Sequence, residues 1–176
     1  GVEPQLVDEL TQALVLRLTA GEGDAAAAGQ ATAGSTRRAS EREAQTLHVR
    51  AGEALARGDY EAARESYQDL VNHYPRDALA RHGLGTALAQ LARYGEAEQE
   101  FRRAIGLRPG LPEAHFNLAG VLQSTGRYDD AEAPLRRALK LKPVYLDARI
   151  SLGMTYLFLG RLKEARECYE KALRVA

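Results

Sequence analysis

The chain has 176 residues, and its 24 basic and 24 acidic side chains leave a formal net charge of zero. This balance gives no electrostatic reason to bind nucleic acid or to insert into an anionic membrane. The single cysteine, Cys168, excludes an internal disulfide framework. Because the sequence shows neither a signal peptide nor an apolar run long enough to span a membrane, a cytoplasmic location is favoured, although the compartment stays open.

The N-terminal segment, residues 1–18, is predicted to form a separate amphipathic helix over residues 4–18. Leu6, Leu10 and Leu14 fall on one face of this helix at a spacing of four residues. A helix of this length is marginally stable alone in water, so its apolar face needs a surface to cover it. Two arrangements are open: the helix packs on its own chain, or it inserts into a second copy and makes a homodimer.

Residues 19–39 are predicted to be a flexible linker. Alanine and glycine dominate this stretch, and no helical or strand period survives in it. Ser40 then precedes Glu43 by three residues, which is the spacing of a capping box at a helix N-terminus. The folded domain is therefore expected to span residues 40–176.

Within this domain the sequence repeats itself every 34 residues, a period typical of stacked helix-turn-helix units. Four units are expected, at about residues 44–77, 78–111, 112–145 and 146–176. The recurring positions are occupied by Tyr60, Tyr94, Tyr128 and Leu162; by Ala63, Ala97, Ala131 and Ala165; by Tyr67, Phe101, Leu135 and Tyr169; by Leu84, Leu118 and Leu152; and by Pro75, Pro109 and Pro143.

These residues, with Gly58, Gly126 and Gly160 at the inner turns, resemble the signature of the tetratricopeptide repeat (TPR) family. The resemblance implies an all-α, right-handed α-solenoid of four helix-turn-helix repeats, preceded by the separate amphipathic helix and the Ala/Gly linker. One departure is Pro134, which falls inside a predicted helix and should bend it locally, because proline removes a helical hydrogen bond.

No arrangement of residues typical of an enzyme or a metal site is found. Gly83-Leu84-Gly85 begins a dinucleotide-binding fingerprint, but the third glycine and the preceding strand are missing. The four histidines are scattered without a second ligand at metal-binding spacing, and Cys168 fits a packing position. We therefore expect no catalysis, no metal and no cofactor.

In the TPR family the first helix of each pair lines a concave groove that binds extended or helical peptides. A clamp for a C-terminal carboxylate is not expected here, because only Asn117 matches it and Glu113 and Asp147 add negative charge. The last repeat instead offers an apolar patch, part of which is also expected in the core. Matching repeat positions places the following residues in the groove: His82, Thr86, Phe116, Asn117, Gly120, Gln123, Ile150, Met154, Leu157 and Phe158.

The leading interpretation is a non-enzymatic protein-protein interaction scaffold that holds a helical or apolar peptide segment in this groove. The partner would be a protein or peptide. Two alternatives are open. TPR arrays like this one resemble those that precede glycosyltransferase or sulfotransferase domains, so the chain could be the substrate-recognition part of a larger enzyme. It could also be a self-assembling adaptor that uses its helix at residues 4–18.

Overall fold

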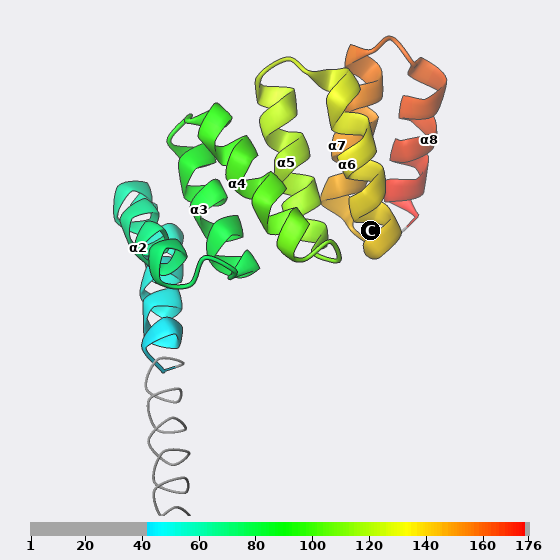
Figure 1. The fold of residues 1–176 in the computed structure, drawn as a ribbon. Coiled ribbons are helices and arrows are strands. Elements are labelled where there is room, and N and C mark those ends of the chain that lie inside the picture. Colours follow the sequence, from blue (N-terminus) through cyan, green and yellow to red (C-terminus); the bar gives the residue numbers. More distant parts are fainter. Residues whose placement is uncertain (1–41, 175–176) are drawn as a thin grey trace, which may run out of the picture. The chain divides into compact units, whose positions relative to one another are not determined.

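The computed structural model of the protein describes residues 42–174, and every regular element in this range is an α-helix (Figure 1). The predicted helix at residues 4–18 and the linker at residues 19–39 lie outside the described residues. The compact unit considered below begins at Thr46. Its helices confirm the all-α class that the repeat predicts.

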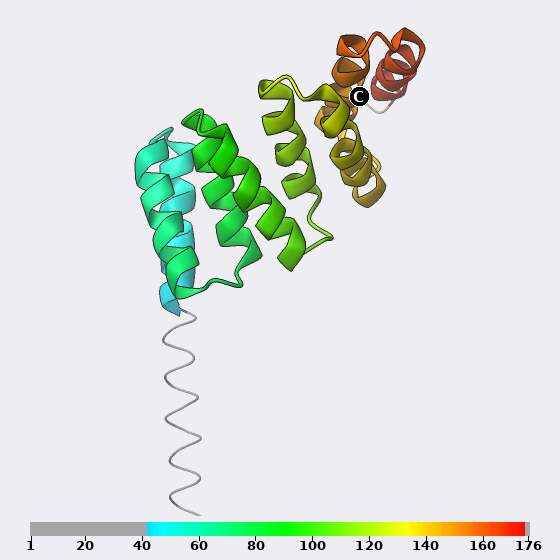
Figure 2. The same ribbon diagram turned by 45° about the horizontal axis from the view of Figure 1, so that its top comes forward.

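The helices follow one another as antiparallel pairs that stack in chain order (Figures 1 and 2). Successive helices pack together, and the first helices of neighbouring pairs, α3, α5 and α7, also touch. This is the helix-pair packing of a TPR solenoid. A helix over residues 42–56 is followed by α2 (Tyr60–His73), α3 (Ala78–Gln90), α4 (Tyr94–Leu107), α5 (Pro112–Ser124), α6 (Tyr128–Leu141), α7 (Leu146–Phe158) and α8 (Leu162–Leu173).

The turns inside the pairs depend on a left-handed backbone conformation. Gly58, Gly126 and Gly160 have φ angles of 76°, 75° and 71°, a region that glycine enters without steric cost. The equivalent residue of the second repeat is Ala92, with a φ of 59°. A side chain in this conformation costs about 1–2 kcal/mol, so the second turn is strained relative to the other three.

The ends of the helices have local causes. The Asp77 carboxylate caps α3 by accepting hydrogen bonds from the backbone N–H groups of Leu79 and Ala80, at 2.9 and 3.0 Å. Pro112 occupies the first turn of α5, where its missing N–H does no harm. Pro134 lies inside α6, as the sequence predicts, and the helix continues through it from Tyr128 to Leu141.

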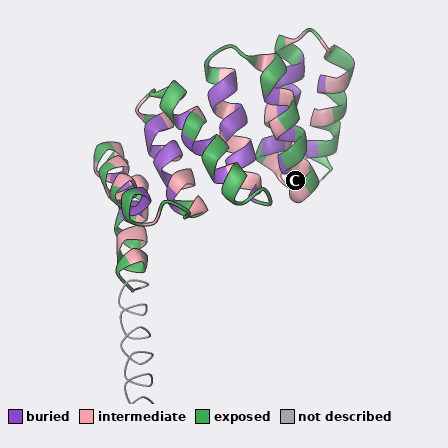
Figure 3. Cartoon of the chain, in the orientation of Figure 1, coloured by how far each residue is buried: buried purple, intermediate pink, exposed green. Residues whose placement is uncertain are grey.

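The core consists of small residues at helix crossings and larger side chains between them. Buried residues are more frequent in α3, α5 and α7 than in their partners α4, α6 and α8 (Figure 3). This difference follows from the stacking, because each first helix also contacts the first helix of a neighbouring pair, whereas the second helices, within the described part of the chain, contact only the helices before and after them. The four repeat alanines are at most 1% exposed: Ala63, Ala97, Ala131 and Ala165.

Size matching between two repeat positions shows how closely these helices approach. A Cβ atom on Gly85 would lie 2.8 Å from the ring of Phe101, and one on Gly153 would lie 2.9 Å from the ring of Tyr169. Real carbon atoms in contact are about 3.5–4.0 Å apart, so an aromatic ring here requires glycine. In the third repeat Ala119 occupies the glycine position, and the smaller Leu135 occupies the position of the ring.

Candidate functional site

All the predicted groove residues belong to α3, α5 and α7, and we call the side of these helices that carries them the groove face. The structure divides them into three groups: residues around a hollow between α3 and α5, a contact between α5 and α7, and apolar side chains on α7. They come from α3 (His82 and Thr86), from α5 (Phe116, Asn117, Gly120 and Gln123) and from α7 (Ile150, Met154, Leu157 and Phe158).

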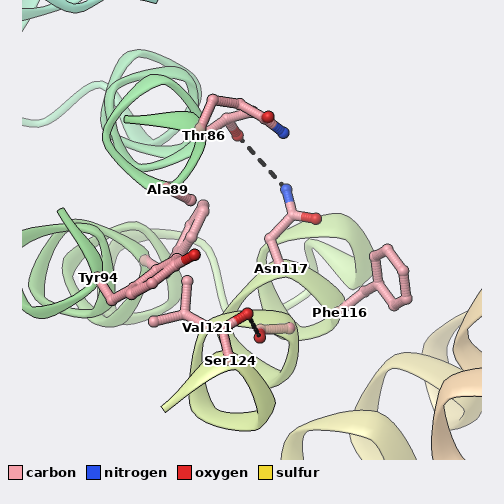
Figure 4. Close-up of a pocket in the computed structure, with 10 residues that line it drawn as sticks. Thr86, Ala89, Tyr94, Phe116, Asn117, Val121 and Ser124 are labelled. Carbon is pink, nitrogen blue, oxygen red and sulfur yellow. Dashed lines mark hydrogen bonds between the residues drawn. The ribbon is translucent and has the colours of Figure 1, made fainter. Parts of the chain in front are cut away.

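The hollow between α3 and α5 has a volume of about 320 Å³ and is lined by Thr86, Asn117 and Tyr94 among others (Figure 4). The Asn117 side-chain amide donates a hydrogen bond to Thr86 Oγ1 at 3.4 Å and one to His82 Nε2 at 2.9 Å. Phe116 lies on the other side of Asn117 from Tyr94 (Figure 4). The polar residues predicted on α3 and α5 therefore bridge the two helices.

The protonation state of His82 follows from its surroundings. Burial lowers the pKa of His82, and the negative charge of Glu113 only partly opposes this effect. The neutral ring can accept the hydrogen bond from Asn117 at Nε2, and its other side lies 5.8 Å from Phe101, centroid to centroid. Because Asn117 is held in this way, it is not free to clamp a carboxylate.

Gln123 of α5 forms the hydrogen bonds that join this helix to α7. Its amide donates hydrogen bonds to the backbone oxygen of Ser151 at 3.0 Å and to Thr155 Oγ1 at 2.7 Å. Its carbonyl oxygen accepts a third bond from Ser151 Oγ at 3.0 Å. With its polar atoms occupied, Gln123 sets the position of α7 relative to α5, and any contact with a ligand would use its remaining apolar surface.

Three apolar side chains form a continuous line along α7. Ile150, Met154 and Phe158, which we call the apolar stripe, are 38%, 47% and 63% exposed. Their spacing of four residues places them on one side of the helix. The Phe158 ring stacks on Tyr128, with centroids 4.3 Å apart and planes at 10°. Leu157 is also 47% exposed, so the expectation that some of these four residues belong to the core is wrong.

Several residues around the groove were missed by the sequence analysis. Gln90 and Ser124 line the hollow. Both occupy the same repeat position as the predicted groove residue Phe158, at steps of 34 residues, so the repeat could have identified them. Tyr94 also lines the hollow, and Tyr128 supports Phe158. The sequence could not place these two rings, because it does not show which way a side chain at the start of a second helix turns.

The remaining chemistry of the described residues is limited. Within residues 42–174 no group of His, Cys, Asp and Glu side chains is arranged to hold a metal ion. In the same range, no helix is both long and apolar enough to cross a membrane. Burial raises the pKa of the Cys168 thiol, which keeps it protonated and weakly reactive at neutral pH. What the groove face offers is apolar area beside hydroxyl and amide groups.

The family comparison agrees with the repeat geometry. The family described as the cilia and flagella-associated protein 70 middle TPR-like domain matches residues 47–176, and the chain belongs to this family. The resemblance to TPR proteins inferred from the sequence is thereby confirmed. No curated protein matches the chain.

Solved structures with the same fold include several at more than a quarter identity. MamA has a TM-score of 0.71 and 27% identity, over 75% of this chain and 77% of that one. TTC0263, a thermophilic TPR protein of Thermus thermophilus, has a TM-score of 0.67 and 29% identity, over 76% and 74%. An O-GlcNAc transferase of Thermobaculum terrenum has a TM-score of 0.62 and 31% identity, over 64% of this chain but 22% of the enzyme.

Proposed function

We propose that the chain is a non-enzymatic protein-binding scaffold that holds a helical or apolar peptide segment on its groove face. The observation that carries this proposal is the apolar stripe of Ile150, Met154 and Phe158, which is 38–63% exposed. An apolar line with a period of four residues is complementary to one face of an amphipathic helix, as in the helix-in-groove mode of recognition. The polar residues around the hollow of α3 and α5 would then contact the edge of the same ligand.

Two features of the stripe favour binding. The Phe158 ring is already oriented by stacking on Tyr128, so a ligand loses less free energy in ordering it. Met154 has an unbranched, polarizable side chain that adapts to different apolar partners. Because the contact is apolar and the chain carries no net charge, the affinity should depend only weakly on salt.

A peptide that corresponds to residues 1–20 of this chain is a suitable probe, because Leu6, Leu10 and Leu14 share the four-residue spacing of the stripe. It would be titrated against a protein of residues 37–176. Phe158→Ala should weaken binding by about 30-fold, the effect of losing an anchor worth about 2 kcal/mol. Leu173→Ala is the matched control, because Leu173 is 79% exposed on α8 and shares the repeat position of Ile105 and Leu139, which lie on the side of the array away from the groove face.

Equal affinities for the Phe158 and Leu173 variants would refute the groove as the binding site. A display selection of helical peptides on the same two variants tests the groove independently of residues 1–20. Selected peptides that bind the Phe158 variant as tightly as the unchanged protein would lead to the same conclusion.

The self-assembling arrangement is a finer form of the same proposal, in which the segment at residues 4–18 occupies the groove of its own chain or of a second copy. Deleting residues 1–36 should then raise the affinity for an added peptide, or convert a dimer into a monomer. The measurements are peptide titration and mass as a function of concentration. If affinity, mass and melting temperature all stay the same, the segment is a passive tail.

The second candidate function is substrate recognition within a larger glycosyltransferase or sulfotransferase. It is favoured by the likeness to the O-GlcNAc transferase, of which this chain spans 22%. A catalytic domain encoded in the same gene, and activity that falls when the apolar stripe is altered, would support it. A cytoplasmic location stays a prediction, and the family description adds cilia and flagella as places to look for partners.

A further inference from the structure

The side of the array opposite the groove face, formed by α2, α4, α6 and α8, contains three crevices that are related by the repeat. They lie between α2 and α4, between α4 and α6, and between α6 and α8, and each has residues of the intervening first helix as its floor. Their volumes are about 170, 580 and 350 Å³. The middle crevice is the largest, and the side chains explain why.

The first crevice is filled by an ion-paired carboxylate. Glu100 is only 8% exposed and accepts a hydrogen bond from Arg81 Nη1 at 2.9 Å. Its second oxygen accepts one from Arg103 on the same helix. The Glu100 carboxylate thus occupies space between α2 and α4, and it pairs with both guanidinium groups although it offsets only one of their two positive charges.

In the middle crevice the same three positions, 34 residues later, hold Pro134, His115 and Arg137. Pro134 is short and has no hydrogen-bond acceptor in its side chain. His115 Nε2 lies 3.1 Å from the backbone oxygen of Pro109, the counterpart of the Pro75 oxygen to which Arg81 also donates. The space that Glu100 fills in the first crevice is therefore open, and Arg137 forms no ion pair with any residue between 42 and 174.

The charges around this crevice are unequal. Arg102 and Arg127 both bond to Glu98, at 2.8 and 2.9 Å, and Arg127 also bonds to Asp130 at 2.7 Å. Three guanidinium groups therefore face two carboxylates, and the uncompensated positive charge is that of Arg137. The floor beneath them is formed by Leu118 and Leu122 of α5, beside His115, and Ile105, Ala133 and Pro134 add apolar surface on the walls.

We propose that the middle crevice is a second docking site, which takes an acidic segment of a partner protein. An apolar side chain of the segment would lie on the floor, and a neighbouring Asp or Glu carboxylate would pair with Arg137. A volume of about 580 Å³ is within the range of ligand-binding sites, and a guanidinium group can hold a carboxylate through two hydrogen bonds. The third crevice is smaller, at about 350 Å³, and its lining places Glu164 and Glu167 among the cationic side chains of Arg136, Lys140, Arg149 and Lys171.

The probe is a fluorescent ten-residue peptide with Leu-Glu-Leu at its centre and Gly-Ser flanks, titrated against the full chain by anisotropy. A matched peptide with Gln in place of Glu should bind about tenfold more weakly or worse, because a hydrogen-bonded charge is lost. Arg137→Gln should cause a similar loss. Arg136→Gln is the control, since this neighbour is 68% exposed, pairs with Glu132 and lines the third crevice.

A second variant reproduces the first crevice in the middle one. Pro134→Glu places a carboxylate beside Arg137, so it should fill the site and reduce binding at least about tenfold. The variant should fold at least as well as the unchanged protein, because it removes a proline from the interior of α6. Phe158→Ala, on the groove face, should leave the affinity for this peptide unchanged, so the two binding proposals can fail separately.

Three outcomes would overturn the proposal. The first is an affinity for the Glu peptide that stays the same in the Arg137→Gln variant, or that stays the same in the Pro134→Glu variant. The second is equal binding of the Glu and Gln peptides, or no binding at a concentration of about 1 mM, the weak limit of specific recognition. The third is a phosphoserine peptide or a nucleic acid that binds more than about tenfold more tightly than the Glu peptide, because such a preference would define a phosphate site.

Discussion

Replacing Gly85 by alanine tests the close approach of α3 and α4 directly. The new Cβ atom would lie 2.8 and 2.9 Å from two ring carbons of Phe101 and 3.2 Å from a third. Because carbon atoms in contact normally lie about 3.5–4.0 Å apart, the ring would have to retreat by roughly 0.7 Å. Phe101 is 0% exposed, so its neighbours in the core would have to move with it.

The expected magnitude is the balance of two effects. Glycine to alanine inside a helix is stabilising by about 1 kcal/mol when nothing else changes. Overpacking a core typically costs about 1–3 kcal/mol. Gly85→Ala should therefore lower the free energy of unfolding by about 1 kcal/mol. Gly120→Ala in α5 is the matched control: its Cβ would meet no atom within 4 Å, so it should raise that free energy by about 0.5–1 kcal/mol.

Thermal unfolding followed by helical circular dichroism measures both variants, and their midpoints should shift in opposite directions, by a few degrees each. A double variant, Gly85→Ala with Phe101→Leu, recreates the pair that Ala119 and Leu135 form in the third repeat. It should recover about 1 kcal/mol relative to the sum of the single variants. The reasoning is refuted if Gly85→Ala stabilises the protein as much as Gly120→Ala, or if the double variant shows no coupling.

Three further predictions concern single positions. Ala92→Gly should raise the free energy of unfolding in urea by up to about 1 kcal/mol, because it removes the cost of a φ of 59°; a decrease would contradict the strained turn. Glu100→Gln should lower the free energy of unfolding by about 1–3 kcal/mol, because the guanidinium groups of Arg81 and Arg103 lose their charged partner. The control is Glu170→Gln, which removes an exposed ion pair and should change the free energy of unfolding by less than about 0.5 kcal/mol. Burial lowers the pKa of His82 below its ordinary 6.5, so the unfolded chain binds the proton at a higher pH than the folded protein does. The contribution of neutral His82 to the free energy of unfolding is therefore complete above pH 6.5. It decreases as the pH falls from 6.5 toward the lower pKa of the folded protein. Urea titrations at several pH values should show a flatter profile for His82→Gln, and an unchanged profile would rule out this assignment.

Much of the fold follows from the sequence, because the interactions that define it are local and recur in every repeat. The 34-residue register predicts that pairs of helices begin near residues 78, 112 and 146, which is where α3, α5 and α7 begin. The same register identifies the alanines at the helix crossings, such as Ala97 and Ala131, because a close crossing excludes any larger side chain.

The sequence could assign the groove residues to one face of the array, but it could not predict which of them form hydrogen bonds there and which remain exposed. Register places Asn117, Gln123 and Met154 together, whereas the tertiary structure shows that the first two have hydrogen-bond partners on neighbouring helices and that Met154 is 47% exposed. Whether a polar side chain is available depends on which groups the adjacent helix presents to it, and a single repeat does not contain that information. Their binding role stays a prediction.

The crevices opposite the groove show most clearly the difference between what the sequence predicts and what only the tertiary structure reveals. Pro134 reads in the sequence as a defect within a helix. Only the packing of α4, α5 and α6 shows that it replaces a buried carboxylate, that His115 does not fill the gap, and that Arg137 has no ion-pair partner among the described residues. The sequence determined which side chains occupy these positions. The open volume and the uncompensated charge were decided only by the packing of α4, α5 and α6, because both depend on distances between residues about 20 positions apart in the chain.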